Sequence, residues 1–289
     1  MQKNDLKVFN DWFYDYIGNF YGSDDYINAN LELKEVHTTH VVNEAKYIAS
    51  GIGLNEKDSL LAETIALFHD LGRFEQFTKY KTYSDHKSEN HSNIAIRVLE
   101  EEKILNILPK NEQKLIITAI RHHNAKDLPN DLDSNQLLHT RLVRDADKLD
   151  IYRVLLDKYL NFYDDKENFN LELEFPDDPW YSDNIIEAIL KEKQAHYHHL
   201  NTLSDMKLLI LAMIYDVNFT PTFQKIRQKG YIQSFFEILP RDKTTQKLNK
   251  KLTDYVNKKL KQKRAGVRPP IYPRHNMKHQ RSKTNSKPG

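Results

Sequence analysis

The segment LLAETIALFHDLG at residues 60–72 combines a long apolar run with a His-Asp pair near its end. The apolar residues recur at helical spacing, which predicts a buried helix over residues 56–71 that Gly72 ends. His69 and Asp70 then lie where an unpaired polar group costs roughly 1–3 kcal/mol. A bound metal ion would satisfy both side chains. The alternative is an ordinary helix C-terminus, with His69 near the negative end of the helix dipole and Asp70 in solvent.

Helical periodicity continues on both sides of this segment, and the sequence contains no convincing strand pattern and no internal repeat. Only 8 residues are Gly, which also favours helices over a turn-rich β fold. The sequence therefore predicts an all-α fold. The expected helices run over residues 4–21, 31–50, 86–102, 111–123 and 136–160, with three or four more between 184 and 260. Loops or connectors are expected at residues 75–85, 127–135 and 161–180.

Other His and Asp residues lie on or beside these predicted helices. Together with His69 and Asp70, the candidates are His37, His91, His123 and Asp147. Helices that pack side by side can aim such side chains at one interior site, and a mixture of imidazole and carboxylate suits Mn, Fe, Co, Ni or Zn. Taken singly, His37 could be a core histidine, His91 a solvated residue of a first helical turn, and Asp147 part of a charged helix face. Their joint order favours a metal site.

Two of these positions have a competing neighbour. His40 lies one turn after His37, and His122 directly precedes His123. Because adjacent helical side chains diverge, His122 and His123 are not expected to bind one ion in the same way. A further histidine patch lies outside the pattern and is interpreted as a surface helix face: His196, His198 and His199.

The composition excludes several classes of protein. The chain has no Cys, so disulfides and thiolate metal sites are ruled out. The N-terminal region lacks a signal-peptide pattern, and no apolar run approaches the roughly 20 residues that cross a bilayer. We therefore expect a cytoplasmic protein without a membrane partner.

Charge is distributed unevenly along the chain. Residues 261–289 contain 9 Lys and Arg and no Asp or Glu, whereas the rest of the chain has a net charge of −7. The expected organisation is an N-terminal helix packing on the core at 1–30, a metal-binding domain at 31–160, a helical extension of the same globule at 161–260, and a disordered basic tail at 261–289. The tail could bind RNA or DNA; the alternative is a flexible solubilising end.

Taken together, these motifs resemble the HD superfamily of metal-dependent phosphohydrolases. The resemblance covers roughly residues 31–154. Its pieces are His37-Thr38-Thr39-His40-Val41, Leu67-Phe68-His69-Asp70-Leu71-Gly72-Arg73-Phe74, Glu89-Asn90-His91, His122-His123-Asn124 and Asp145-Ala146-Asp147-Lys148-Leu149-Asp150. The His-Asp-Leu-Gly-Arg and Asp-Ala-Asp-Lys-Leu-Asp pieces are the specific ones. An all-α, compact HD-type helical bundle follows as the expected fold.

The resemblance also implies a set of metal ligands. His37, His69, Asp70 and Asp147 would hold a first divalent ion, and Asp70 would bridge to a second held by His91 and His123. Family spacing favours His37 over His40 and His123 over His122. The implied cofactor is a pair of divalent metal ions, with Mn, Fe, Co, Ni, Mg and Zn all open.

For the reaction, the resemblance implies hydrolysis of a phosphoester by a hydroxide that bridges the two metals. Arg73 and Lys148 are near the ligands in sequence and could clamp the phosphate, the alternative for each being a surface ion pair. Asp150 and Gln76 could orient the ligands. The expected substrate is a nucleotide or a related phosphorylated small molecule. Two alternative functions stay open: a regulatory nucleotide-binding module with little turnover, and a nucleic-acid processing protein. A homodimer is a separate expectation for the assembly.

Overall fold

The computed structural model describes residues 1–161 and 175–262, and within these ranges it contains helices and no strand. This confirms the all-α prediction. The N-terminal half consists of α1 (Lys3–Gly18), α2 (Asp25–Ile52), α3 (Glu56–Phe68), α4 (Gly72–Tyr80), α5 (His91–Glu101), the short 3-10 helix η1 (Ile104–Ile107), α6 (Lys110–His122) and α7 (Ser134–Asn161). The C-terminal half consists of α8 (Asp183–Leu190), η2 (Tyr197–His199), α9 (Leu203–Ala212), η3 (Met213–Asp216), α10 (Thr220–Lys229), α11 (Tyr231–Glu237) and α12 (Lys243–Gln262).

Side chains at the helix ends explain several boundaries. Asp24 caps α2, because its side chain accepts a hydrogen bond from the backbone N–H of Ile27. Asn90 caps α5 in the same way. Gly53 ends α2 with a φ of 74°, a left-handed conformation that glycine adopts without a steric penalty.

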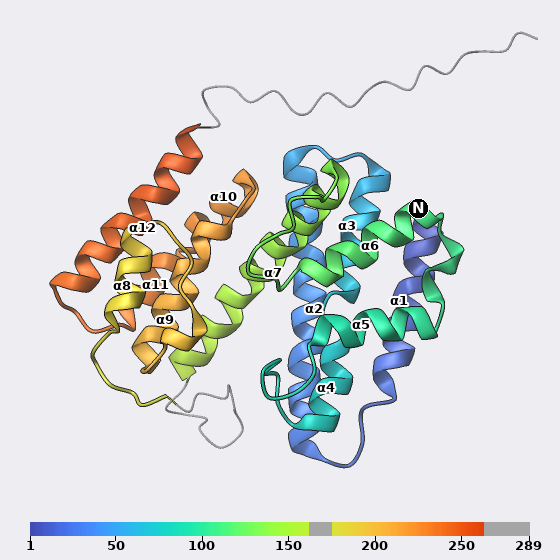
Figure 1. The fold of residues 1–289 in the computed structure, drawn as a ribbon, viewed down its shortest axis with the longest axis horizontal. Coiled ribbons are helices and arrows are strands. Elements are labelled where there is room, and N and C mark those ends of the chain that lie inside the picture. Colours follow the sequence, from blue (N-terminus) through green and yellow to red (C-terminus); the bar gives the residue numbers. More distant parts are fainter. Residues whose placement is uncertain (162–174, 263–289) are drawn as a thin grey trace, which may run out of the picture.

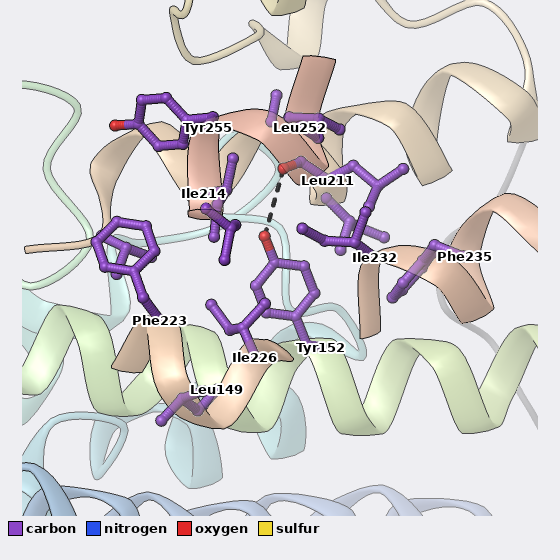
Figure 2. Close-up of a cluster of buried hydrophobic side chains, with 14 of the residues drawn as sticks. Leu149, Tyr152, Leu211, Ile214, Phe223, Ile226, Ile232, Phe235, Leu252 and Tyr255 are labelled. Atoms are coloured by element: carbon purple, nitrogen blue, oxygen red, sulfur yellow. Dashed lines mark hydrogen bonds between the residues drawn. The ribbon is translucent and has the colours of Figure 1, made fainter. Parts of the chain in front are cut away.

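The long helix α7 runs between two groups of helices, α1–α6 on one side and α8–α12 on the other (Figure 1). Two apolar cores lie within the described residues. One core contains aromatic residues of α1, α3 and α4, and it reaches α7 at Val143. The other contains residues of α2, α7 and α8–α12, with the fully buried Tyr152 of α7 among them. Figure 2 shows this second core, where the hydroxyl of Tyr152 donates to the backbone oxygen of Leu211 at 3.3 Å. The rigid packing on both sides fixes the position of α7.

The structure corrects part of the predicted helix pattern. Residues 75–80 belong to α4 and not to a loop, because Phe74 and Phe77 are buried at helical spacing in a segment that is otherwise rich in Tyr, Lys and Thr. Gly72 begins this helix; α3 already ends at Phe68. The predicted helix at 86–102 begins only at His91, since Asn90 takes the capping position.

The C-terminal half differs from expectation as well. Five α-helices, α8 to α12, occur within residues 175–262, where three or four were predicted. The His196 patch is not an α-helix face, because η2 spans only Tyr197–His199. The predicted disordered tail lies outside the described residues, apart from its first residues in α12, and so does much of the connector at 161–180. Among the helices that the structure describes, none is both long and apolar enough to cross a membrane.

Candidate metal centre

The six candidate ligands lie on or beside five helices, α2, α3, α5, α6 and α7, and meet in the N-terminal half. Asp70 lies in the turn between α3 and α4, and His69 directly follows α3. His91 is the first residue of α5, His123 directly follows α6, and the remaining two ligands are His37 of α2 and Asp147 of α7. Five of the six are buried, and the side chain of Asp147 is 19% exposed. The sequence order alone could not bring them together; the packing of five helix ends and faces does.

Four of these residues surround a first point. The Nε2 atom of His37 lies 3.2 Å from Oδ1 of Asp147 and 3.6 Å from Oδ2 of Asp70. The Nε2 atom of His69 lies 3.8 Å from each of the same two carboxylate oxygens. Ligand atoms of His37, His69 and Asp70 therefore lie close enough together to hold one ion, and Asp147 lies beside both imidazoles.

The other two histidines surround a second point. Oδ1 of Asp70 lies 3.3 Å from Nε2 of His91 and 3.8 Å from Nε2 of His123. The two histidine Nε2 atoms are 3.0 Å apart. Asp70 therefore turns Oδ2 toward the first group and Oδ1 toward the second, which is the arrangement of a carboxylate that bridges two cations.

The Nδ1 atom of each of these histidines is occupied by a hydrogen bond. The acceptors are Oδ2 of Asp150 for His37 (2.7 Å), the backbone oxygen of Ala66 for His69 (2.7 Å), the carboxylate of Asp85 for His91 (2.9 Å) and the backbone oxygen of Ile120 for His123 (2.8 Å). A carbonyl or carboxylate acceptor requires that Nδ1 carries the proton. In its neutral form each ring therefore has an Nε2 lone pair that can bind a metal, and the acceptor behind the ring fixes the direction of this lone pair.

Within the described residues, two of these Nε2 atoms have no hydrogen-bond partner. In the described part of the chain, neither Nε2 of His37 nor Nε2 of His69 makes a hydrogen bond, although both atoms are buried. The Nε2 atoms of His91 and His123 face each other, and with protons on both Nδ1 atoms no proton lies between them. Buried polar atoms of this kind are costly unless a cation satisfies them. The donor set fits divalent metal ions at both points.

The electrostatics keep His69, His91 and Asp70 in the form that binds metal, whereas the pKa of His37 is raised, because burial and the Lys34 charge are outweighed by hydrogen bonds to two carboxylates. Burial lowers the pKa of His69 to about 4, and burial together with the Arg73 charge lowers the pKa of His91 to about 3. Although burial opposes it, the ammonium of Lys34 holds the pKa of Asp70 well below its usual range. At neutral pH His69 and His91 are therefore neutral, and Asp70 is ionised.

The structure also separates the competing histidines. His40 has a side chain that is 43% exposed, and its Nδ1 atom is 4.0 Å from Asp150. His122 belongs to neither group of converging ligand atoms in the described residues, whereas His123 belongs to the second. The geometry thus agrees with His37 and His123 as the candidate ligands.

Arg73 and Lys148 both line the space above the ligands, but each already has partners. Arg73 donates to Gln76 at 2.8 Å and to Asp85 at 3.2 Å, and its Nε lies 3.4 Å from Oδ1 of Asp70. Arg73 therefore ties the loop that carries Asp85 to the metal centre. Gln76 also donates to Asp85, so it supports His91 through that carboxylate and not directly.

Lys148 contacts the C-terminal half. Its Nζ atom lies 2.6 Å from Oδ2 of Asp216, which also accepts from Arg144 at 2.7 Å. Arg144 in turn donates to the backbone oxygens of His122 and His123. Asp216 thus holds Arg144, which contacts the backbone at His123. Because Arg144 and Asp216 are 72 residues apart, no local sequence pattern could indicate this connection.

Four residues that contribute to the site were missed by the sequence analysis. Lys34 lies one helical turn before His37, and its Nζ atom is 2.8 Å from Oδ2 of Asp70. Asp85, which accepts from His91, lies in a segment predicted only as a loop. His196 and His198 line the space above the ligands, although they were interpreted as a separate surface patch. Of these residues, only Lys34 could have been found from the sequence, because it lies on the same helix face as His37.

A cavity of about 730 Å³ opens above the ligands, and we call it the central cavity. His37, Asp70 and Asp147 form part of its floor, and Lys34, Lys126 and Lys148 are among the cationic residues that line it. The cavity combines metal ligands with lysine ammonium groups, which is a suitable environment for an anionic ligand.

Comparison with known families agrees with this geometry. Residues 35–152 match the family model described as HD domain, and this range includes all six candidate ligands. No curated protein and no solved structure is significantly similar to the chain. The matched range begins just before His37 and ends shortly after Asp150, so it contains both converging groups and the carboxylate that orients His37. Residues 35–152 of this chain are thus similar to an HD domain, which is consistent with the HD superfamily of metal-dependent phosphohydrolases.

Proposed function

We propose that this protein hydrolyses a phosphoester bond in a nucleotide or a related phosphorylated small molecule, with divalent metal ions bound at the two converging groups. One observation carries the proposal: Asp70 turns one carboxylate oxygen to the His37–His69 pair and the other to the His91–His123 pair. Divalent ions bound there would lower the pKa of a water molecule and neutralise charge on the phosphoryl oxygens. In the reaction, the water oxygen bonds to phosphorus, the bond from phosphorus to the ester oxygen breaks, and the released alcohol takes up a proton.

The residues of the chain supply orientation and charge. Asp150 and Asp85 hold the rings of His37 and His91 so that both Nε2 atoms point inward. Lys34 is paired with Asp70. When a cation neutralises that carboxylate, the Lys34 ammonium becomes available to the phosphate of the substrate. Lys148 lines the same cavity, and we infer the same role for it, with Asp216 holding its side chain in place.

The test begins with elemental analysis of the purified protein and a phosphoester screen under Mn, Fe, Co, Ni and Mg. Asp70→Ala and His69→Ala are expected to lose bound metal and turnover together, because Asp70 serves both groups and His69 has no other partner for Nε2. Wild-type metal content and turnover in both variants would refute the site.

The chain offers matched controls for two of the ligands. His40→Ala lies one turn from His37 but removes an exposed imidazole, and His122→Ala is adjacent to His123. Both controls should keep metal content and turnover, whereas His37→Ala and His123→Ala should lose metal. Tight binding of a nucleotide without any product would instead favour a regulatory module.

A further inference from the structure

A second, mostly apolar cavity of about 470 Å³ lies beside the metal centre, and we call it the apolar cavity. Its wall includes Leu33 of α2, Ile151, Val154 and Leu155 of α7, and Met206 of α9. The volume is within the range of about 300–1,000 Å³ that is usual for small-molecule sites. Since apolar walls gain free energy only from apolar ligand surface, the cavity is suited to a group without charge.

The apolar cavity continues into the central cavity. Lys34, His37, His86, Ile151 and Tyr197 line both spaces. A single molecule can therefore place one end at the metal ligands and the other end among the apolar side chains.

Helix geometry sets the length of such a molecule. Ile151 and Leu155 follow Asp147 on α7 by one and two helical turns, so they lie about 6 and 12 Å along the helix axis from this ligand. On α2, Leu33 lies one turn before His37. The apolar wall thus begins directly next to the phosphate position and extends by about the length of one or two rings.

The polar groups of the apolar cavity are mostly engaged elsewhere. The side-chain N–H of Asn30 donates to the backbone oxygen of Tyr26. Lys34 pairs with Asp70, and Asp85 accepts from His91. These charged residues face the metal centre, and the far wall of Val154, Leu155 and Met206 is apolar. A second phosphate or a charged group would lose its hydration here without compensation.

The C-terminal half completes this cavity. Tyr197 and Met206 lie beyond the family match at 35–152. The ring of Tyr197 is 52% exposed where both cavities meet, although large aromatic side chains are usually more buried. An exposed ring at the junction offers a stacking surface for a flat ligand group.

We propose that the substrate is a phosphomonoester whose organic part is a largely apolar group of one or two rings, held in the apolar cavity while the phosphate lies at the metal ligands. This proposal rests on the proposed function for the position of the phosphate. It assigns the choice of substrate to α7 and to Tyr197 and Met206 of the C-terminal half. Each additional methylene buried in the cavity should increase affinity about fourfold.

The test compares 2-naphthyl phosphate, phenyl phosphate and glycerol phosphate as substrates of the metal-loaded protein, with a nucleoside 5′-monophosphate to show whether a sugar between ring and phosphate is accepted. We expect kcat/KM for 2-naphthyl phosphate to exceed that for glycerol phosphate at least tenfold. Leu155→Trp fills the far end of the cavity and should remove this preference, so that kcat/KM for 2-naphthyl phosphate falls to that for glycerol phosphate.

Leu160→Trp is the matched control, because Leu160 lies on the same helix but is 57% exposed and outside the apolar cavity. This control should keep the preference for the naphthyl ester. If Leu155→Trp fails to fold, as judged by circular dichroism, Met206→Trp fills the same space from α9. An equal kcat/KM for the naphthyl and glycerol esters in the wild type, or a preference that survives both cavity-filling variants, would overturn the proposal.

A binding measurement separates this proposal from the proposed function. By calorimetry, 2-naphthylmethylphosphonate, which has no ester bond to hydrolyse, should bind the metal-loaded wild type at least tenfold more tightly than methylphosphonate, and Leu155→Trp should abolish the difference. If no phosphoester is hydrolysed but this difference is present, the proposed function fails and the cavity assignment stands. If phosphoesters are hydrolysed and the two phosphonates bind equally, the cavity assignment fails alone.

Discussion

Gly72→Ala should destabilise the protein and disturb the second half of the metal centre. A Cβ atom at this position would lie 2.1 Å from the backbone oxygen of His91, 2.8 Å from the backbone nitrogen of Ala95 and 2.9 Å from Cβ of Ile94. Two of these three atoms belong to the backbone of α5 and cannot rotate away. The helices α4 and α5 would therefore have to separate by about 1 Å to restore van der Waals contact.

The loss of folding stability in Gly72→Ala can be estimated from the kind of clash. Overpacking in a protein interior typically costs about 1–3 kcal/mol, and the upper end applies because backbone must move. For a protein of this size, about 3 kcal/mol corresponds to a decrease in the melting temperature of roughly 6 °C. The movement also displaces His91, whose Nε2 atom must stay close to Oδ1 of Asp70. A ligand displaced by about 1 Å is expected to reduce turnover by up to about 100-fold.

The assay measures thermal unfolding in EDTA, so that bound metal does not contribute, and metal content of the untreated protein. Gly18→Ala is the control, because no atom lies within 4 Å of its added Cβ and its φ is not left-handed. The control should melt at the wild-type temperature or slightly above it. A Gly72→Ala protein with unchanged melting temperature and metal content would refute the close approach of α4 and α5.

The metal centre and the core around Tyr152 allow three more tests. Asp150→Asn should weaken metal binding about 10- to 100-fold in a chelator competition, since it replaces the carboxylate that orients His37; unchanged affinity would contradict that role. Tyr152→Phe should reduce the free energy of unfolding by about 1 kcal/mol in urea, because the hydrogen bond to Leu211 is lost, while metal content stays the same. Adding metal at 100 times its Kd should stabilise the metal-free protein by about 2.7 kcal/mol, and identical melting curves with and without metal would argue against binding to the folded state.

The sequence by itself determined the helical class and the candidate ligands. Apolar residues at helical spacing depend only on neighbours three and four positions away, so α1, α3, α6 and α7 could be predicted within a few residues. The helix predicted at 31–50 was found too, but α2 begins earlier, at Asp25. The His69-Asp70 pair at the end of a buried helix indicated a metal site because such groups need a partner. The order of the remaining His and Asp residues then led to the HD family, which the family match supports independently.

Only the tertiary structure decided how these residues act together. It turns His37 inward and leaves His40 exposed, and it gives Asp70 one oxygen for each pair of histidines. It also brings Asp85 behind His91. Asp70 is far along the chain from His37 and His91, and Asp85 lies more than one helical turn from His91, so local periodicity carries no information about these contacts.

The same reason explains the errors in the sequence analysis. Gly72 looked like a helix end, but the structure shows that its missing side chain lets α5 approach α4. His196 and His198 were interpreted as a surface helix face outside the motif pattern, yet they line the central cavity above the ligands. Close approach between distant segments depends on the packing of whole helices, and this packing is set by the complete apolar core and not by any short stretch of sequence.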